Sequence, residues 1–237
     1  MTVFMSLNKL ALNLLFLIVC VETRNITIYN KCPFIIWPGI QGPGNPSEGG
    51  FTLNSGQSRD IIVDDAWTAG RIWARTGCDD DFNCETGFCI NAEKCNGASG
   101  VPPASIAEFT LRAFGGQDLY DVYLANGYNL PIMITPKGGS GCSRAGGCVK
   151  DINAECPVAL SVKGSSGKTV ACKSACLKYG TDQECCRGAY GTPDKCHSTA
   201  TSQMFKDACP TAYSYPFDSV SCSFTCQATA SYTVQFC

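Results

Sequence analysis

Short runs patterned like β-strands recur along the chain, separated by turns rich in Gly, Pro and Asn. In residues 231–236 (SYTVQF) the alternation is strict, as in a strand with one buried face. The other predicted strands cover residues 26–30, 34–38, 50–54, 59–63, 71–76, 107–114, 119–125 and 131–136. Asn54, Ser55 and Gly56 are typical of a hairpin turn. Many short strands with closely spaced turns predict a mainly β protein built as a β-sandwich.

Two segments break this pattern. Residues 78–103 contain four cysteines and little periodicity, which predicts a small region of loops held by disulfides. Residues 149–208 are rich in cysteine and carry the only clear helical signals. We therefore expect a sandwich with two disulfide-rich appendages, of which the second contains short helices.

The helical signals in the second segment are local. Within residues 168–180, Cys172 and Cys176 are four apart and would share one helical face. Gly180 is a typical helix stop. In the segment that follows, Thr181 and Glu184 are three residues apart and match a capping box. Residues 201–210 predict a second short helix.

The first residues are typical of a signal peptide. Residues 10–21 are apolar and follow Lys9, and this stretch is too short to span a bilayer of about 30 Å. Cleavage before Arg24 would remove residues 1–23, although a cut up to three residues earlier fits equally well. A retained membrane anchor is the alternative. No second apolar run of this length follows, so we expect no transmembrane segment after processing.

Eighteen cysteines in 237 residues indicate an oxidising compartment, which agrees with secretion to the extracellular space. The chain has no CxxC pair, and its one histidine is His197, so we expect no metal site and no cofactor. Removing residues 1–23 leaves the net charge at −2, which argues against a nucleic-acid partner. Asn25 begins an Asn-Ile-Thr acceptor for N-glycosylation.

Several longer motifs are more specific. They are ITIYNKCPFIIWPG, AGRIWARTGC, CNGASGVPPASIAEFTL, YDVYLANGYNLP, a paired CC, ACPTAYSYPFD and YTVQFC, in that order. With these motifs the chain resembles the thaumatin-like, pathogenesis-related proteins from about residue 26 to its end. The resemblance implies an antiparallel sandwich in residues 24–77, 104–148 and 209–237, with appendages at 78–103 and 149–208.

The same resemblance implies how the cysteines pair. The implied disulfides are Cys32–Cys237, Cys78–Cys84, Cys89–Cys95, Cys142–Cys226, Cys148–Cys209, Cys156–Cys172, Cys176–Cys185 and Cys186–Cys196. Cys20 would leave with the signal peptide, and Cys222 is left over. Cys222 is expected to be a free buried thiol, with an intermolecular bridge or a bridge to Cys20 as alternatives.

The resemblance also implies an acidic cleft lined by one arginine, one glutamate and three aspartates. These positions fall on Arg75, Glu108, Asp121, Asn126 and Asp218, so an amide replaces one aspartate of the family pattern. A β-glucan is a neutral chain of hydroxyls, which carboxylates and amides can bind. Hydrolysis would need one protonated and one ionised carboxyl group, and we expect Glu108 as the general acid and Asp121 as the nucleophile or base.

A structural interpretation stands beside this one, in which Glu108 faces solvent and Arg75 forms an ion pair with one acid. On the resemblance, we expect a monomeric, secreted antifungal defence protein that binds β-1,3-glucan or the fungal cell wall in the acidic cleft. One alternative is a weak endo-β-1,3-glucanase that uses Glu108 and Asp121. The other is an inhibitor of digestive amylases or proteases, which would act through an exposed loop.

Overall fold

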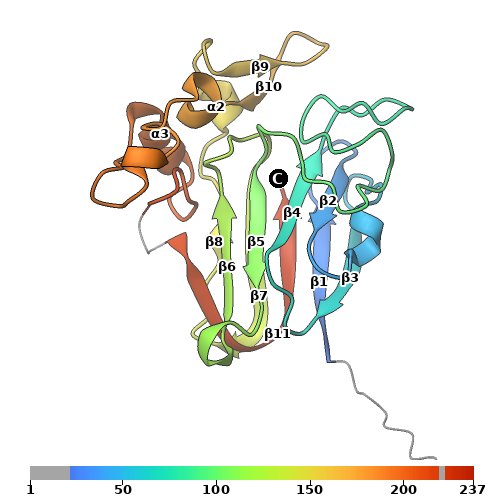
Figure 1. Cartoon of the computed structure of the whole chain (residues 1–237). Helices are drawn as coiled ribbons and strands as arrows, with labels where there is room; N and C mark the ends of the chain where they lie inside the picture. Colours follow the sequence, from blue (N-terminus) through green and yellow to red (C-terminus); the bar gives the residue numbers. More distant parts are fainter. Residues whose placement is uncertain (1–21, 219–221) are drawn as a thin grey trace, which may run out of the picture.

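The computed structural model describes residues 22–218 and 222–237 of the chain (Figure 1). Two β-sheets pack face to face, and the cysteine-rich segments lie above one end of them. The strands are β1 (Thr23–Asn30), β2 (Trp37–Gln41), β3 (Ser58–Asp64), β4 (Gly70–Arg75), β5 (Ile106–Thr110), β6 (Asp118–Tyr123), β7 (Ile132–Ser140), β8 (Ala145–Gly146), β9 (Ser161–Lys163), β10 (Thr169–Cys172) and β11 (Phe224–Phe236). The helices are α1 (Ile152–Glu155), α2 (Ala175–Tyr179) and α3 (Ala200–Ala208), with 3₁₀ turns η1 (Pro46–Gly49), η2 (Phe114–Gly116) and η3 (Gly188–Tyr190).

The long strand β11 belongs to both sheets. Its first residues pair with β6, so that one sheet runs in the order β2-β4-β5-β6-β11. Its last residues pair with β1 on one side and β7 on the other, and β3 and β8 extend that second sheet. Among the described strands the pairs are antiparallel except β1 with β11, which is parallel. The predicted sandwich is therefore confirmed, with one parallel pair inside it.

The core lies between the two sheets. In β6, Tyr120 and Val122 are buried, whereas Asp121 and Tyr123 are only half-buried on the opposite face. Phe109 of β5 meets Tyr232 of β11 edge to face, with ring centroids 5.3 Å apart. Such aromatic pairs add to the stabilisation from apolar burial. This alternation directs the polar residues of β4, β5 and β6 to the outer face of their sheet.

The loop region at residues 78–103 covers one end of that outer face. Trp73 of β4 is 2% exposed and packs there with Cys89, Cys95 and Ile106. Its indole N–H donates to the Gly87 carbonyl oxygen at 2.8 Å, which satisfies its one donor. The outer face of the sheet is therefore closed at this end and open at the other.

Two predicted strands differ from the structure. Residues 50–54 form no strand and make only isolated bridges, Leu53 with Ile36 and Gly50 with Gly39. Strand β2 consequently begins at Trp37, three residues later than its alternating pattern indicates. The η1 turn lies between Gly39 and Gly50, which form one of these bridges, and its helical conformation interrupts regular strand pairing there.

The helix expected over residues 168–180 is wrong for its first half. Residues Thr169–Cys172 form β10 and pair with β9, and α2 begins only after Ser174. The Ser174 hydroxyl accepts from the Leu177 N–H at 3.3 Å, as an N-cap does. Cys172 and Cys176 therefore lie on different elements. The expected stop at Gly180 is confirmed, since this residue adopts a left-handed conformation with φ of 66°.

The second short helix is confirmed as α3. Thr199 and Ser202 form its capping box, in which the hydroxyl of each residue accepts from the backbone N–H of the other. The capping box predicted at Thr181 is only half formed. The Glu184 N–H donates to the Thr181 hydroxyl at 3.2 Å, but the segment makes turns and no helix follows.

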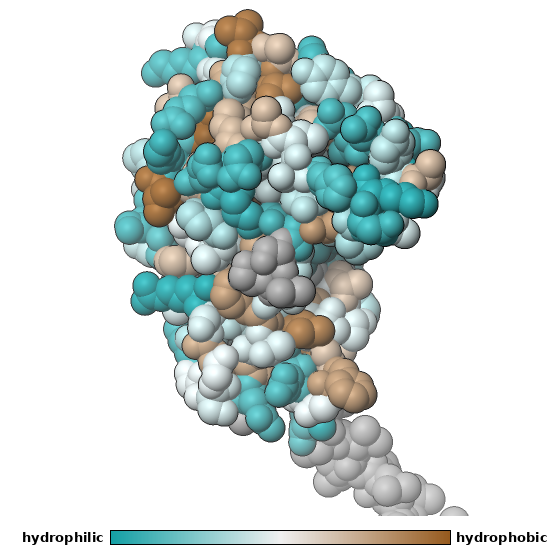
Figure 2. All heavy atoms as spheres, turned by 90° about the vertical axis from the view of Figure 1, so that its left-hand side faces the viewer, coloured by the Kyte–Doolittle hydropathy of each residue, from teal (hydrophilic) through white to brown (hydrophobic). Residues whose placement is uncertain are grey.

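Eight disulfides join the described cysteines, and their pairing is the one that the resemblance implies. They are Cys32–Cys237, Cys78–Cys84, Cys89–Cys95, Cys142–Cys226, Cys148–Cys209, Cys156–Cys172, Cys176–Cys185 and Cys186–Cys196. Cys222 is a free, buried thiol. Cys148–Cys209 joins the end of α3 to the chain after β8, and Cys176–Cys185 joins α2 to the turns that follow it. This region carries many hydrophilic residues on its outer side (Figure 2).

The expected signal peptide lies outside the described residues, apart from Glu22 and Thr23. The Glu22 carbonyl oxygen accepts from the Asp65 N–H at 3.0 Å, and Thr23 opens β1 opposite Asp64. Among the described helices, none is long and apolar enough to cross a bilayer.

Candidate functional site

Three charged side chains form a row across the open end of the outer face. Arg71 of β4 pairs with Glu108 of β5, and Glu108 pairs with Asp121 of β6, as direct cross-strand partners. The Arg71 Nε atom lies 2.8 Å from Glu108 Oε1. Cross-strand partners on one face have Cβ atoms about 4.5–5.5 Å apart, so the two carboxyl groups are close neighbours. We call these three residues the acidic row.

Asp121 is the least solvated member of the acidic row. Burial, and then the nearby Glu108 carboxylate, raise the pKa of its carboxyl group to about 7, although Arg71 opposes both effects. Its Oδ1 atom is buried and has no hydrogen-bond partner among the described residues. The Glu108 Oε1 atom is buried as well, but the Glu108 side chain is 26% exposed and has a cationic partner in Arg71. Asp121 can therefore hold a proton near neutral pH beside an ion-paired Glu108.

Two tyrosines border the acidic row. Tyr123 follows Asp121 by two residues on the same face of β6, and Tyr213 lies against it with ring centroids 6.3 Å apart. Burial, and then Glu108, raises the pKa of Tyr123 to about 12, so this phenol stays neutral and keeps its donor. The acidic row, together with Ser223 of the segment before β11, lines a hollow of about 210 Å³.

Arg75 is not part of this site, which corrects the expectation from the sequence. It is fully buried, and its guanidinium donates to the carbonyl oxygens of Trp37, Ala92 and Glu93. Burial lowers its pKa to about 10, which still leaves it charged at neutral pH. Arg75 points to the same face as Arg71, but four residues further along β4, where residues 78–103 cover the sheet. Arg75 therefore holds residues 78–103 against the sheet and does not line a cleft.

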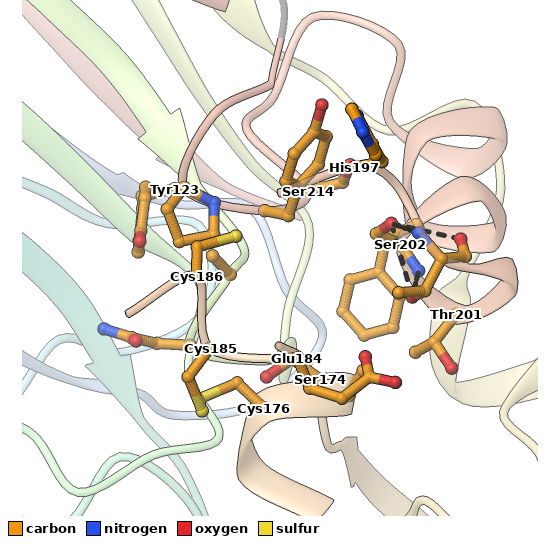
Figure 3. Close-up of a pocket in the computed structure, with 17 residues that line it drawn as sticks. Tyr123, Ser174, Cys176, Glu184, Cys185, Cys186, His197, Thr201, Ser202 and Ser214 are labelled. Atoms are coloured by element: carbon orange, nitrogen blue, oxygen red, sulfur yellow. Dashed lines mark hydrogen bonds between the residues drawn. A yellow bond between two sulfur atoms is a disulfide. The ribbon is translucent and has the colours of Figure 1, made fainter. Parts of the chain in front are cut away.

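Asn126 lines a separate recess of about 110 Å³ between the end of β6 and the helical region. Figure 3 shows Tyr123 on one side of this recess and Ser202 of α3 on the other, with Glu184 below them. Tyr123 borders both this recess and the acidic row. The recess therefore adjoins the acidic row but does not bring Asn126 into it.

Asp218 is held by other partners. Its Oδ2 atom accepts from the Ser214 N–H and hydroxyl, each at 2.8 Å, and lies 2.8 Å from the Lys206 ammonium. Its side chain is only 7% exposed. Asp218 fixes the chain that carries Tyr213, and this chain forms one wall beside the acidic row.

The predicted glycosylation site lies in β1, away from the acidic row. The Asn25 Nδ2 atom donates to Asp60 Oδ2 at 2.9 Å, and the Thr27 hydroxyl donates to Asp60 Oδ1 at 2.7 Å. Glycosylation of Asn25 stays a prediction.

The sequence pattern missed Arg71 and Tyr123 as members of this site. Arg71 lies two residues before Trp73 in the strand predicted at residues 71–76, so the two side chains share one face of the strand. The outward direction of Arg71 can therefore be inferred from the sequence. Tyr213 comes to the site through an isolated bridge with Tyr123, and no local pattern signals such a contact.

Comparison with known proteins places the chain in a family. A sequence model described as "Thaumatin family" matches residues 30–237. "Pathogenesis-related thaumatin-like protein 3.5" of Cryptomeria japonica is 47% identical over 89% of this chain and 88% of its own length. A protein of Prunus avium named "Glucan endo-1,3-beta-glucosidase" is 44% identical over 91% of each chain.

A solved structure shares the fold at low sequence identity. A laminaripentaose-producing β-1,3-glucanase, solved in complex with laminaritetraose, superimposes with a TM-score of 0.59 at 10% identity, covering 90% of this chain and 98% of its own. This likeness concerns the fold alone. On the family match and the identity to its relatives, the chain belongs to the thaumatin family.

Proposed function

We propose that residues 24–237 are a secreted, monomeric defence protein that binds β-1,3-glucan of fungal cell walls at the acidic row. The observation that carries this proposal is the cross-strand pair of Glu108 and Asp121 on an open sheet face. The name of the Cryptomeria japonica relative includes "pathogenesis-related", which supports the defence role. Eight disulfides and the apolar leader support secretion.

The chemistry of the hollow suits an uncharged polymer of hydroxyl groups. Within the hollow Glu108 offers carboxylate oxygens as acceptors and Arg71 offers donors, and the Tyr123 phenol lies beside the hollow as a further donor. Tyr123 and Tyr213 add aromatic surface that can cover the C–H face of a sugar ring. The walls are held by strands and by the Asp218 contacts, so little ordering is needed on binding.

Retention on insoluble β-1,3-glucan tests this proposal. Asp121→Asn and Glu108→Gln should weaken retention about three- to tenfold, because each replaces a carboxyl group of the row with an amide that has different donors and acceptors. The matched control is Asp60→Asn on β3, which changes one carboxylate outside the row. Equal retention by all three variants and the parent protein would contradict binding at the acidic row. Capture of a digestive amylase or protease in place of glucan would favour the inhibitor function.

A weak endo-β-1,3-glucanase is the second candidate, favoured by the raised pKa of Asp121 and by the name of the Prunus avium relative. On the raised pKa of Asp121 we propose the opposite of the roles expected from the sequence. Asp121, which holds its proton, would act as the general acid, and the ion-paired Glu108 would act as the nucleophile or base. Purified protein should then release reducing sugar from β-1,3-glucan, and Asp121→Asn should abolish this release. Retention without any release would remove the enzyme function and keep the binding function.

A further inference from the structure

A second and larger groove lies away from the acidic row. It has a volume of about 790 Å³, within the range of about 300–1,000 Å³ that is typical of ligand sites. One wall is formed by the chain before and at the start of β2, with Phe34, Ile35 and Trp37. The other wall is formed by α1 and the hairpin between β9 and β10, including Asp151 and Lys168. No residue of the acidic row lines this groove.

The first wall exposes apolar surface. Phe34 and Ile35 are 43% and 41% exposed, although both are large hydrophobic residues next to each other in the chain. Trp37 beside them is half-buried. A contiguous apolar wall in a concave site is a feature of ligand pockets.

The opposite wall is polar and carries both signs of charge. Glu85 and Asp151 contribute two carboxylates, and Lys168 contributes one ammonium, in the same groove as Ser166 and Thr169. A purely apolar ligand would leave these groups desolvated without partners, and an ion of either sign would meet a like charge. A neutral ligand with both an apolar face and hydroxyl groups meets neither cost.

The groove is also preformed. At one end the Ser165 N–H donates to Glu85 Oε1 at 2.6 Å, which ties the β9–β10 hairpin to the loop region at 78–103. At the other end the Asn153 Nδ2 atom donates to the Asn129 carbonyl oxygen at 2.8 Å. The disulfide Cys32–Cys237 holds the chain next to Phe34. These links reduce the ordering cost of binding.

We propose that this groove is a second binding site of the protein, and that its ligand is a short neutral oligosaccharide. The apolar face of a sugar ring would lie on Phe34 and Trp37, and its hydroxyl groups would meet Asp151, Lys168 and Ser166 on the opposite wall. The site does not depend on the acidic row, so it stands whether or not the row binds glucan.

Trp37 supplies a direct readout. The other two tryptophans, Trp67 and Trp73, are 1% and 2% exposed, so Trp37 is the one that solvent and ligands can reach. The full processed chain is titrated with three neutral hexasaccharides, β-1,3-gluco-, β-1,4-gluco- and β-1,4-N-acetylglucosamine hexaose. At least one should shift the tryptophan emission saturably and protect it from acrylamide quenching.

Variants then locate the signal. Phe34→Ala should weaken the titration about three- to tenfold, because it removes part of the apolar wall. Phe114→Ala is the matched control, since Phe114 is a fully exposed phenylalanine of η2 outside the groove. Lys168→Ala is a second groove variant on an exposed side chain, and it should also weaken binding. The guanidinium midpoint of each variant shows that it has folded.

Three results would overturn the second site. The first is no response of Trp37 to any of the three hexasaccharides. The second is a response that Asp121→Asn abolishes and Phe34→Ala leaves intact, since the sugar would then occupy the acidic row. The third is a response to octanol alone, which would make the groove a site for apolar amphiphiles. If the parent protein showed the Trp37 response but was not retained on insoluble β-1,3-glucan, this would contradict only the function proposed for the acidic row.

Discussion

The ammonium of Lys206 lies 2.7 Å from the thiol sulfur of Cys222 and links α3 to the segment before β11. Cys222 has no exposed surface, and no disulfide partner among the described cysteines. Burial lowers the pKa of Lys206, but Asp218 and Cys222 outweigh this effect and leave the pKa raised, so the amine stays charged.

The processed protein should therefore contain one thiol that is shielded in the native state. An aromatic disulfide reagent should label it slowly under native conditions and completely in guanidinium without reductant, at one thiol per chain. Fast native labelling would contradict the buried position, and a covalent dimer on a non-reducing gel would show an intermolecular bridge instead.

Replacing Lys206 with methionine should destabilise the protein by about 1–3 kcal/mol. The change leaves the Asp218 carboxylate, which is 7% exposed, without its cation and removes a donor to the Ala212 carbonyl oxygen. Guanidinium unfolding measures the effect. Lys178→Met on α2 is the control, because this exposed lysine forms no ion pair with the described residues, and it should change stability by less than about 0.5 kcal/mol.

The stability should fall with pH because of Asp121. Its pKa is about 7 in the folded protein against 3.8 for the ordinary side chain, so between these values the folded state holds a proton that the unfolded state has released. Stability from this group is therefore complete below about pH 4 and is lost as the pH rises through 7. Asp121→Asn should be more stable than the parent protein at pH 8, by at most about 4 kcal/mol, and nearly equal to it at pH 4.

Asp60 should give the opposite pH dependence of folding stability in the same experiment. Hydrogen bonds from Asn25 and Thr27 lower the pKa of its carboxyl group, so its stabilisation is present above about pH 4 and lost on acidification. Asp60→Asn should therefore reduce stability at pH 8 and have little effect at the lowest pH. The same sign for both variants would refute the assigned environments.

Variants of Arg71 and Arg75 should separate effects on glucan binding from effects on folding stability. Arg75→Met leaves three carbonyl acceptors buried and should cost about 2–4 kcal/mol in unfolding free energy, with glucan retention kept by the folded protein. Arg71→Gln removes a half-exposed ion pair and should cost less than about 1 kcal/mol while weakening retention. Measuring midpoint and retention for both variants tests the claim, and exchanged phenotypes would show that Arg75 is the functional arginine.

The disulfides should contribute according to the loops that they close. Cys32–Cys237 spans 205 residues and Cys78–Cys84 spans 6, so loop-closure entropy predicts losses of about 5 and about 2 kcal/mol when each pair is replaced by alanine. Guanidinium midpoints of the two double variants test this order. An equal or reversed order would show that strain or residual unfolded structure outweighs chain entropy.

Much of the fold follows from the sequence because alternation and turns are local. The runs at β1, β3, β4 and β6 carry that signal and form strands close to the predicted bounds. The segment at residues 168–180 does not, because helical spacing of Cys172 and Cys176 competes with β-branched Thr169 and Val170. Pairing with β9 decides the first half for a strand, and the Ser174 cap delays the helix.

The candidate site was only partly predictable for a related reason. Glu108 and Asp121 alternate outward in strong strands, so their shared face could be inferred. Arg71 and Arg75 have the same direction, and only the position of residues 78–103 decides which of them is covered. That covering depends on tertiary contacts, which neither periodicity nor composition contains.

The double membership of β11 sets the order of folding events. The second sheet lacks its central strand until β11 (Phe224–Phe236) has been synthesised, and the first sheet lacks the end strand that pairs with β6. Pairs such as Ile28 with Val234 connect opposite ends of the polypeptide, and distant pairings of this kind slow folding. Pairing across the second sheet therefore has to wait for residues 224–236, and without them β1 and β7 would have no strand between them.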